Sequence, residues 1–120
     1  MKGMRKGLVW CSLVLMIVIS GCVKTSASEE TTILLREYSI NPERTVLKNS
    51  AAPFVIKVKN EGADDHNFVV EELGIDSGII APGKIVNVTL NIKESGEFKA
   101  KCTLPGHTEA GMVSEVVVQP

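Results

Sequence analysis

Three side chains that bind soft metal ions lie within an eleven-residue segment near the C-terminal end of the sequence. Cys102, His107 and Met112 provide a thiol, an imidazole and a thioether, and Pro105 and two glycines bend the chain between them. His66, the other of the two histidines, lies upstream. One cysteine, two histidines and a weak sulfur ligand form the donor set of blue-copper electron-transfer sites. The sequence therefore predicts a metal centre with one-electron chemistry.

Zinc is the main alternative metal, because two histidines and one cysteine also suit Zn²⁺. Methionine is a poor zinc ligand, however, and copper binds more tightly than zinc to such a set. A hydrolytic site would also need a general base, and the sequence shows no nucleophile–base pair and no phosphate-binding glycine loop. The carboxylates of Glu61, Asp64 and Asp65 are hard ligands, and a solvated loop is the simpler interpretation of them. We therefore expect one copper ion and no enzymatic activity.

Short strands are expected to position these ligands. Alternating apolar residues predict strands at about 31–38, 45–48, 54–59, 66–72, 85–92, 97–102 and 112–118. No stretch of this part shows a helical period, and turn signals recur about every ten residues, which predicts an all-β, antiparallel sandwich of seven to eight strands. In this pattern His66 enters a strand, Cys102 ends a strand with its side chain inward, and Met112 begins the last strand.

The N-terminal segment has the composition of an export signal. Three basic residues precede an apolar run over residues 8–19, which is short for a membrane-spanning helix. An aliphatic residue, two small residues and Cys22 follow, which is similar to the lipobox of prokaryotic lipoproteins and implies a lipid on Cys22. An ordinary signal peptide and an uncleaved anchor are the alternatives, and all three imply export. We expect a signal peptide at 1–21, a flexible tether at 22–30 and one globular domain at 31–120.

Processing at this site would change the meaning of the three cysteines. Cys11 would be removed and Cys22 would carry lipid, so Cys102 would be the one remaining thiol and the domain could form no internal disulfide. A lone thiol in an oxidising compartment is explained by metal ligation. Removal of residues 1–21 takes away three basic residues and no acidic one, which changes the net charge from −1 to −4. This charge excludes the basic footprint of a nucleic-acid-binding protein.

Two segments of the sequence resemble the cupredoxins, the blue copper proteins that include plastocyanin, azurin, auracyanin and halocyanin. They are His66-Asn67-Phe68 and Cys102-Thr103-Leu104-Pro105-Gly106-His107 followed by Gly111-Met112. The resemblance extends over residues 31–120. Four residues separate Cys102 from His107, where plastocyanins have two, so the loop is more similar to those of azurin and auracyanin.

The resemblance implies a Greek-key sandwich with a single type 1 copper ion. Its equatorial ligands would be His66, Cys102 and His107, and its axial ligand would be Met112. The resemblance also implies that Asn67 stiffens the site through hydrogen bonds toward the cysteine loop, where Thr103 is the natural partner.

The function implied is a membrane-tethered, monomeric carrier of single electrons, with copper cycling between Cu(I) and Cu(II) on the outer face of a cytoplasmic membrane. Cytochromes or membrane oxidoreductase complexes would dock at the edge of His107, and Glu109 with the acidic residues at 61, 64 and 65 would steer a basic partner. The apolar patch around His107 would consist of Leu104, Pro105 and Ala110. Two other classes stay open: a copper carrier or storage protein of the cell envelope, and a domain whose metal only stabilises it.

Overall fold

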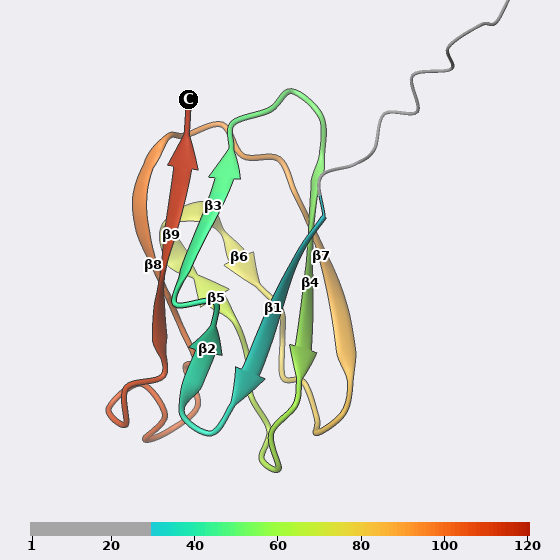
Figure 1. Cartoon of the computed structure of the whole chain (residues 1–120), viewed down its shortest axis with the longest axis vertical. Helices are drawn as coiled ribbons and strands as arrows, with labels where there is room; N and C mark the ends of the chain where they lie inside the picture. The colour runs from blue at the N-terminus through green and yellow to red at the C-terminus, as the bar shows by residue number, and fades with distance from the viewer. Residues whose placement is uncertain (1–29) are drawn as a thin grey trace, which may run out of the picture.

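Nine strands in two sheets make up the part of the chain that the computed structural model describes, residues 30–120 (Figure 1). The strands are β1 (Glu30–Arg36), β2 (Ser39–Asn41), β3 (Arg44–Lys48), β4 (Phe54–Asn60), β5 (Val69–Val70), β6 (Ile75–Asp76), β7 (Ile85–Leu90), β8 (Gly96–Lys101) and β9 (Val113–Gln119). One sheet has the order β2-β1-β4-β7 and the other β3-β9-β8-β5-β6. A 3₁₀ turn, η1 (Glu71–Leu73), is the one helical element within these residues.

The predicted features of residues 1–29 lie outside the described part of the chain. They include the signal peptide at 1–21, the lipid attachment at Cys22 and all of the tether at 22–30 except Glu30, which begins β1. Among residues 30–120, no helix has the length and apolar character needed to cross a membrane.

Alternation of apolar and polar residues explains how the two sheets pack. In β4 the side chains of Phe54, Ile56 and Val58 are buried, and the residues between them are half-exposed. Because successive strand residues point to opposite faces, this strand directs one complete face into the core. Complete burial of an Ile or Val side chain stabilises the fold by about 1.5–3 kcal/mol. The same core receives Ile33 and Leu35 from β1.

The predicted all-β sandwich is confirmed, with nine strands instead of seven to eight. The additional strands, β2 and β6, have three and two residues, which is too short to show a period of two. The strand expected at 66–72 was too long: β5 has two residues, η1 follows it, and Gly74 ends η1 with φ 65°. His66 itself makes only an isolated bridge to Ile80.

The expectation of purely antiparallel pairing was wrong. β1 runs parallel to β4, and β3 runs parallel to β9, while the other pairs are antiparallel. Side chains alternate with the same period in both kinds of pair, so alternation reports which face is buried and not the direction of the neighbouring strand.

Three connections gather at one end of the sandwich, the lower end in Figure 1. They are the turn between β1 and β2, the loop between β4 and β5, and the loop between β8 and β9. The second contains His66 and the third contains His107, while Cys102 directly follows β8. The sandwich therefore brings distant segments of the chain to the same place.

Candidate metal centre

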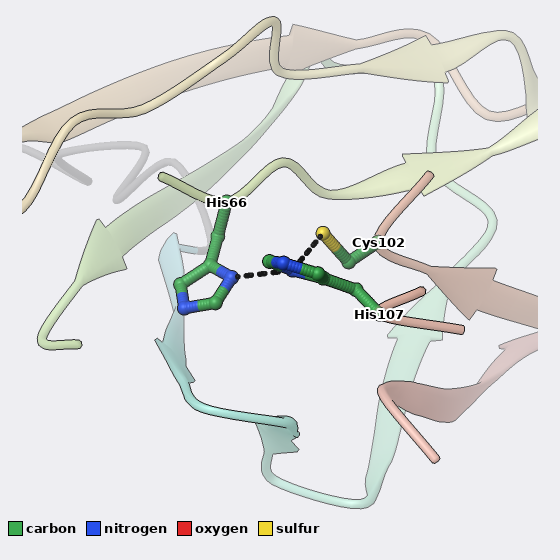
Figure 2. Close-up of side chains that lie close together, drawn as sticks. All are labelled: His66, Cys102 and His107. Carbon is green, nitrogen blue, oxygen red and sulfur yellow. Dashed lines mark hydrogen bonds between the residues drawn. The ribbon is translucent and has the colours of Figure 1, made fainter. Parts of the chain in front are cut away.

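The side chains of His66, Cys102 and His107 converge at this end of the molecule (Figure 2). Their ligand atoms all lie within 4.8 Å of one another. Nδ1 of His107 is 3.1 Å from Nδ1 of His66 and 3.5 Å from Sγ of Cys102. Imidazole and thiolate ligands that bind one ion at about 2.0–2.3 Å lie roughly 3–4 Å apart, so these atoms are spaced to share one metal.

Cys102 is buried because it continues the inward face of β8. Its side chain is 0% exposed, like that of Ala100 two residues earlier. The backbone N–H of Asn67 points to Sγ at 3.5 Å, and the backbone N–H of Cys102 donates to the carbonyl of Met112 at 3.1 Å. An N–H donor stabilises the charged form of sulfur, which is the form that binds metals.

His107 lies in a compact loop that folds largely on itself. Its own N–H donates to the carbonyl of Leu104 at 3.1 Å, and the hydroxyl of Thr108 donates to the carbonyl of Cys102 at 2.6 Å. Gly106 and Gly111 have φ angles of 82° and 99°, in the left-handed region that favours glycine. These turns direct the imidazole back toward the thiol and leave it half-buried.

Met112 returns from this loop to the core. Its side chain is 0% exposed, and its N–H donates to the carbonyl of His107 at 3.0 Å. Together with the bond from Cys102, this ties the backbone of Met112 to both neighbouring ligand candidates. The coordination of a metal by its thioether stays a prediction.

Asn67 and Thr103, the pair expected to connect the two ligand segments, form two hydrogen bonds. Nδ2 of Asn67 donates to Oγ1 of Thr103 at 2.7 Å, and the backbone N–H of Thr103 donates to Oδ1 of Asn67 at 2.7 Å. Asn67 is buried, at 7% exposed, whereas Thr103 is exposed, so the pair joins the His66 and Cys102 segments at the edge of the buried cluster. Contacts of this kind fix the orientation of metal ligands.

Two neighbouring residues that sequence reasoning missed each contact one of the histidines. Oε1 of Glu37 lies 3.3 Å from Nε2 of His66, and the Tyr38 ring packs edge-on against His107 with centroids 5.3 Å apart. Both belong to the turn between β1 and β2, and Glu37 lies 29 residues before His66 in sequence. No local pattern distinguishes them from ordinary turn residues, so only the sandwich topology could identify them.

Two glutamates near the site, Glu37 and Glu61, have lowered pKa values for different reasons. Backbone hydrogen bonds, chiefly from Asp64, lower the pKa of Glu37 from 4.5 to about 2. The pKa of Glu61 is also lowered, by the ammonium of Lys59 and then by the guanidinium of Arg36, at 3.0 and 2.7 Å. Glu61 is therefore compensated by two cations.

The chemistry of the donor set fits a single type 1 copper ion, as expected. Thiolate and imidazole suit both Cu(I) and Cu(II), and a thioether is a weak axial ligand in such sites. The donors come from a buried cluster in which Cys102, His66 and Met112 are 0% exposed.

A two-sheet sandwich with a thiol and two imidazoles at one end is typical of small copper-binding β proteins. The family model described as "Cupredoxin-like domain" matches residues 9–114. The chain belongs to this family, which confirms the resemblance seen in the two ligand segments.

Solved structures of the same fold include an auracyanin and an azurin. Dithionite-reduced auracyanin from Roseiflexus castenholzii has a TM-score of 0.66 at 18% identity, over 78% of this chain and 99% of that chain. Azurin iso-2 from Methylomonas sp. strain J has a TM-score of 0.63 at 17% identity, over 78% of this chain and 100% of that chain. The copper-containing nitrite reductase of Thermus scotoductus has a TM-score of 0.64 at 18% identity, over 77% of this chain but only 28% of that chain. At these identities the similarity shows the fold.

A curated relative is the copper-resistant cuproprotein CopI of Pseudomonas aeruginosa. It is 36% identical over 45 residues, which are 38% of this chain and 25% of CopI. The match thus spans a quarter of the length of that protein.

Proposed function

We propose that this protein carries single electrons between redox partners and uses one type 1 copper ion held by His66, Cys102, His107 and Met112. The observation that carries the proposal is the convergence of two imidazoles and one thiol, within 4.8 Å, at the end of a cupredoxin sandwich. A bound copper ion supplies one-electron chemistry by cycling between Cu(I) and Cu(II).

The protein's contribution is to hold the donors still. Asn67 connects the His66 segment to Thr103, and the backbone of Met112 bonds to both Cys102 and His107. Ligands held by hydrogen bonds between separate segments of the chain change their positions little when the charge of the ion changes. Burial of Cys102 and His66 also keeps water away from the ion.

His107 provides the route to the surface. It is half-buried, whereas His66 is 0% exposed, and the exposed residues Pro105 and Ala110 lie in the same loop. The Tyr38 ring, 46% exposed, extends this surface from the edge of His107. We expect a partner to dock over this small apolar surface, with the half-buried Leu104 at its base.

A basic partner, such as a cytochrome, is favoured by the groove that begins at Tyr38. The groove is lined by four carboxylates and one ammonium: Glu43, Glu72, Glu97, Glu115 and Lys99. Arg44 neutralises part of this charge by pairing with Glu115 at 3.2 Å and with Glu97 at 3.9 Å, which leaves Glu43 and Glu72 as the groove carboxylates without an ion pair among the described residues. This groove is a stronger candidate than Glu61 for attracting a basic partner, because the charge of Glu61 is compensated by Lys59 and Arg36. Electron-transfer rates with a basic cytochrome should fall as salt rises, and rates that ignore salt would contradict steering.

We further propose that the protein works on the outer face of a cytoplasmic membrane, anchored by lipid on Cys22. The support is the sequence of residues 1–22 alone. Mass spectrometry of the mature N-terminus tests this proposal. A Cys22→Ser variant should lose the lipid and leave the membrane fraction, and an unmodified Cys22 in the native protein would contradict the anchor.

The central experiment is the visible spectrum of the purified full-length chain loaded with Cu(II). We expect an intense thiolate-to-copper band that disappears on reduction and is absent in Cys102→Ser. Met112→Leu should keep the band and raise the reduction potential, because the axial thioether tunes that potential. A colourless protein would contradict the electron-carrier function, and an unchanged potential in Met112→Leu would exclude Met112 as the axial ligand.

Copper carriage or storage in the cell envelope is the second candidate function, and the short match to the copper-resistant cuproprotein CopI supports it. In a carrier, copper is cargo that must leave the site readily. The two functions differ in how fast Cu(I) passes to an excess of a competing chelator. Transfer within seconds would favour the carrier, whereas retention over hours with reversible oxidation and reduction supports electron transfer.

A further inference from the structure

The imidazole of His66 is enclosed, and its two nitrogens face different groups. Nδ1 faces the metal-binding cluster, 3.1 Å from Nδ1 of His107. Nε2 faces away from the cluster and lies 3.3 Å from Oε1 of Glu37. The His66 side chain is 0% exposed, while that of Glu37 is 35% exposed, so Nε2 of a buried imidazole meets a partly exposed carboxylate.

The carboxylate of Glu37 is held in place by the chain that leads to His66. Its Oε1 accepts hydrogen bonds from the backbone N–H groups of Ala63 at 2.5 Å and Asp64 at 2.8 Å. Three donors, including Nε2 of His66, therefore meet one oxygen atom. A carboxylate with several donors is fixed in position and stays ionised at neutral pH.

The donor loop is itself fixed by a buried amide. Nδ2 of Asn60 donates to the carbonyls of Asp64 and Ile80, both at 2.7 Å, and Oδ1 of Asn60 accepts from the N–H of Gly62 at 2.8 Å. Asn60 is 0% exposed. The loop is thus rigid on the side that presents its N–H groups to Glu37.

Gly62 leaves the space that Glu37 occupies. A Cβ atom at position 62 would lie 2.3 Å from Oε1 of Glu37 and 2.9 Å from Nε2 of His66. Contacts under 3.0 Å require something to move. The contact between Glu37 and His66 therefore depends on glycine at position 62, because a side chain there would push the carboxylate away from the imidazole.

We propose that Glu37 is a positioning residue for the metal: its carboxylate accepts a hydrogen bond from the Nε2–H of His66, fixes Nδ1 as the ligand atom, and favours Cu(II) over Cu(I) through its negative charge. Gly62 is the residue that permits this contact. The proposal rests on the copper site proposed above, although its tautomer component concerns the metal-free protein as well.

The physical basis is the coupling between the two nitrogens of one ring. A neutral imidazole with a proton on Nε2 has its free lone pair on Nδ1. An acceptor that hydrogen-bonds to Nε2–H therefore selects Nδ1 as the metal ligand. A fixed negative charge beyond the ring stabilises the more highly charged ion. The resemblance to cupredoxins implies such a supporting role only for Asn67 and Thr103, which act on the Cys102 side of the site.

The test compares three variants, Glu37→Gln, Glu37→Ala and Gly62→Ala, in the full-length chain. Glu94→Gln is the matched control: it removes the same charge from an exposed glutamate in the loop between β7 and β8, at the opposite end of the sandwich (Figure 1). Nitrogen NMR of the metal-free protein reports the tautomer of His66. Chelator competition gives the affinities for Cu(I) and Cu(II), and voltammetry gives the reduction potential.

We expect the NMR spectrum of the native protein to show a proton on Nε2 of His66. Glu37→Ala should produce a mixture of tautomers and weaken copper binding about 10- to 100-fold, as loss of a ligand's hydrogen-bond partner does in other metal sites. Glu37→Gln keeps an oxygen acceptor and should keep the tautomer, but it should favour Cu(I) by about tenfold, which corresponds to a rise of about 59 mV in potential. Gly62→Ala should resemble Glu37→Ala although Glu37 is unchanged.

The proposal fails if the native chain has the proton on Nδ1, or if Glu37→Gln and Glu37→Ala match the Glu94→Gln control in tautomer and potential. It also fails if either Glu37 variant lowers the potential. A native chain that binds no copper contradicts the proposed function, and the NMR result then still decides whether Glu37 sets the tautomer of His66.

Discussion

The two segments that supply the histidines are held in opposite ways. His66 follows a loop fixed from outside by the turn between β1 and β2 and by Asn60, and its backbone exchanges hydrogen bonds with Ile80 at 3.2 and 2.7 Å. His107 sits in a loop whose hydrogen bonds are mainly internal, such as Ala110 N–H to the carbonyl of Gly106 at 3.1 Å. The first histidine is 0% exposed and the second is half-buried.

We infer from this difference that the two imidazoles have different roles. The enclosed His66 is suited to fix the position and the electronic environment of the metal. The half-exposed His107 is suited to exchange electrons with a partner at the surface. Changes in the His66 segment should therefore alter stability and reduction potential, and changes around His107 should alter access to the metal and partner docking.

The largest expected effect comes from replacing each histidine by glycine. Both His66→Gly and His107→Gly should abolish the thiolate-to-copper band expected of the copper-loaded protein, because each removes a proposed equatorial ligand. Added imidazole should restore the band faster in His107→Gly, since that position is reached from the surface. Stopped-flow absorbance gives both rates. Equal rates would contradict the comparison between an enclosed and an exposed histidine.

The next largest effect is expected for Asn60→Ala. Its buried amide makes three hydrogen bonds, to Asp64, Ile80 and Gly62, and each contributes about 1 kcal/mol. The free energy of unfolding should therefore fall by about 3 kcal/mol in urea denaturation of the metal-free chain. Asn87→Ala, an exposed asparagine in β7, is the control and should change little. A similar small loss in both variants would mean that the loop before His66 is not fixed by Asn60.

A smaller effect is expected in the other loop for Thr108→Val. This change removes one hydrogen bond, from the hydroxyl of Thr108 to the carbonyl of Cys102, and should cost about 1 kcal/mol of unfolding free energy. Thr89→Val, at an exposed position of β7, is the matched control. A loss as large as that of Asn60→Ala would show that the two loops depend equally on single side chains.

The smallest effect is expected for Glu61→Gln, and it should depend on pH. The pKa of Glu61 is lowered from 4.5 by Lys59 and Arg36, so its ionised form favours the folded state. That stabilisation is present above about pH 4.5, the unfolded value, and is lost as the pH falls through the lower folded value. Unfolding curves at neutral and acidic pH should show the variant less stable than the native chain only at neutral pH. A pH-independent difference would exclude this ion pair as the cause.

Much of the sandwich was predictable because a strand with one buried face alternates apolar and polar residues along its sequence. Alternation predicts strands at 54–59 and 85–92, where β4 and β7 lie, and Phe54, Ile56 and Val58 of β4 are all buried on one face. The short strands β2 and β6 escaped detection, since two or three residues cannot display a period. The parallel pairs of β1 with β4 and β3 with β9 were also missed, because strand direction is decided by the connections across the whole domain.

The sequence by itself determined the types of donor at the candidate centre: one thiol, two imidazoles and a thioether in a Cys-Pro-Gly-His-Gly-Met loop. Donor chemistry belongs to the residue, so it can be read without coordinates. Only the tertiary structure decided which groups surround those donors. Glu37 and Tyr38 reach His66 and His107 because the turn between β1 and β2 lies at the same end of the sandwich as the two ligand loops. Such contacts depend on the packing of segments distant in sequence, and the chain leaves no local pattern that records them.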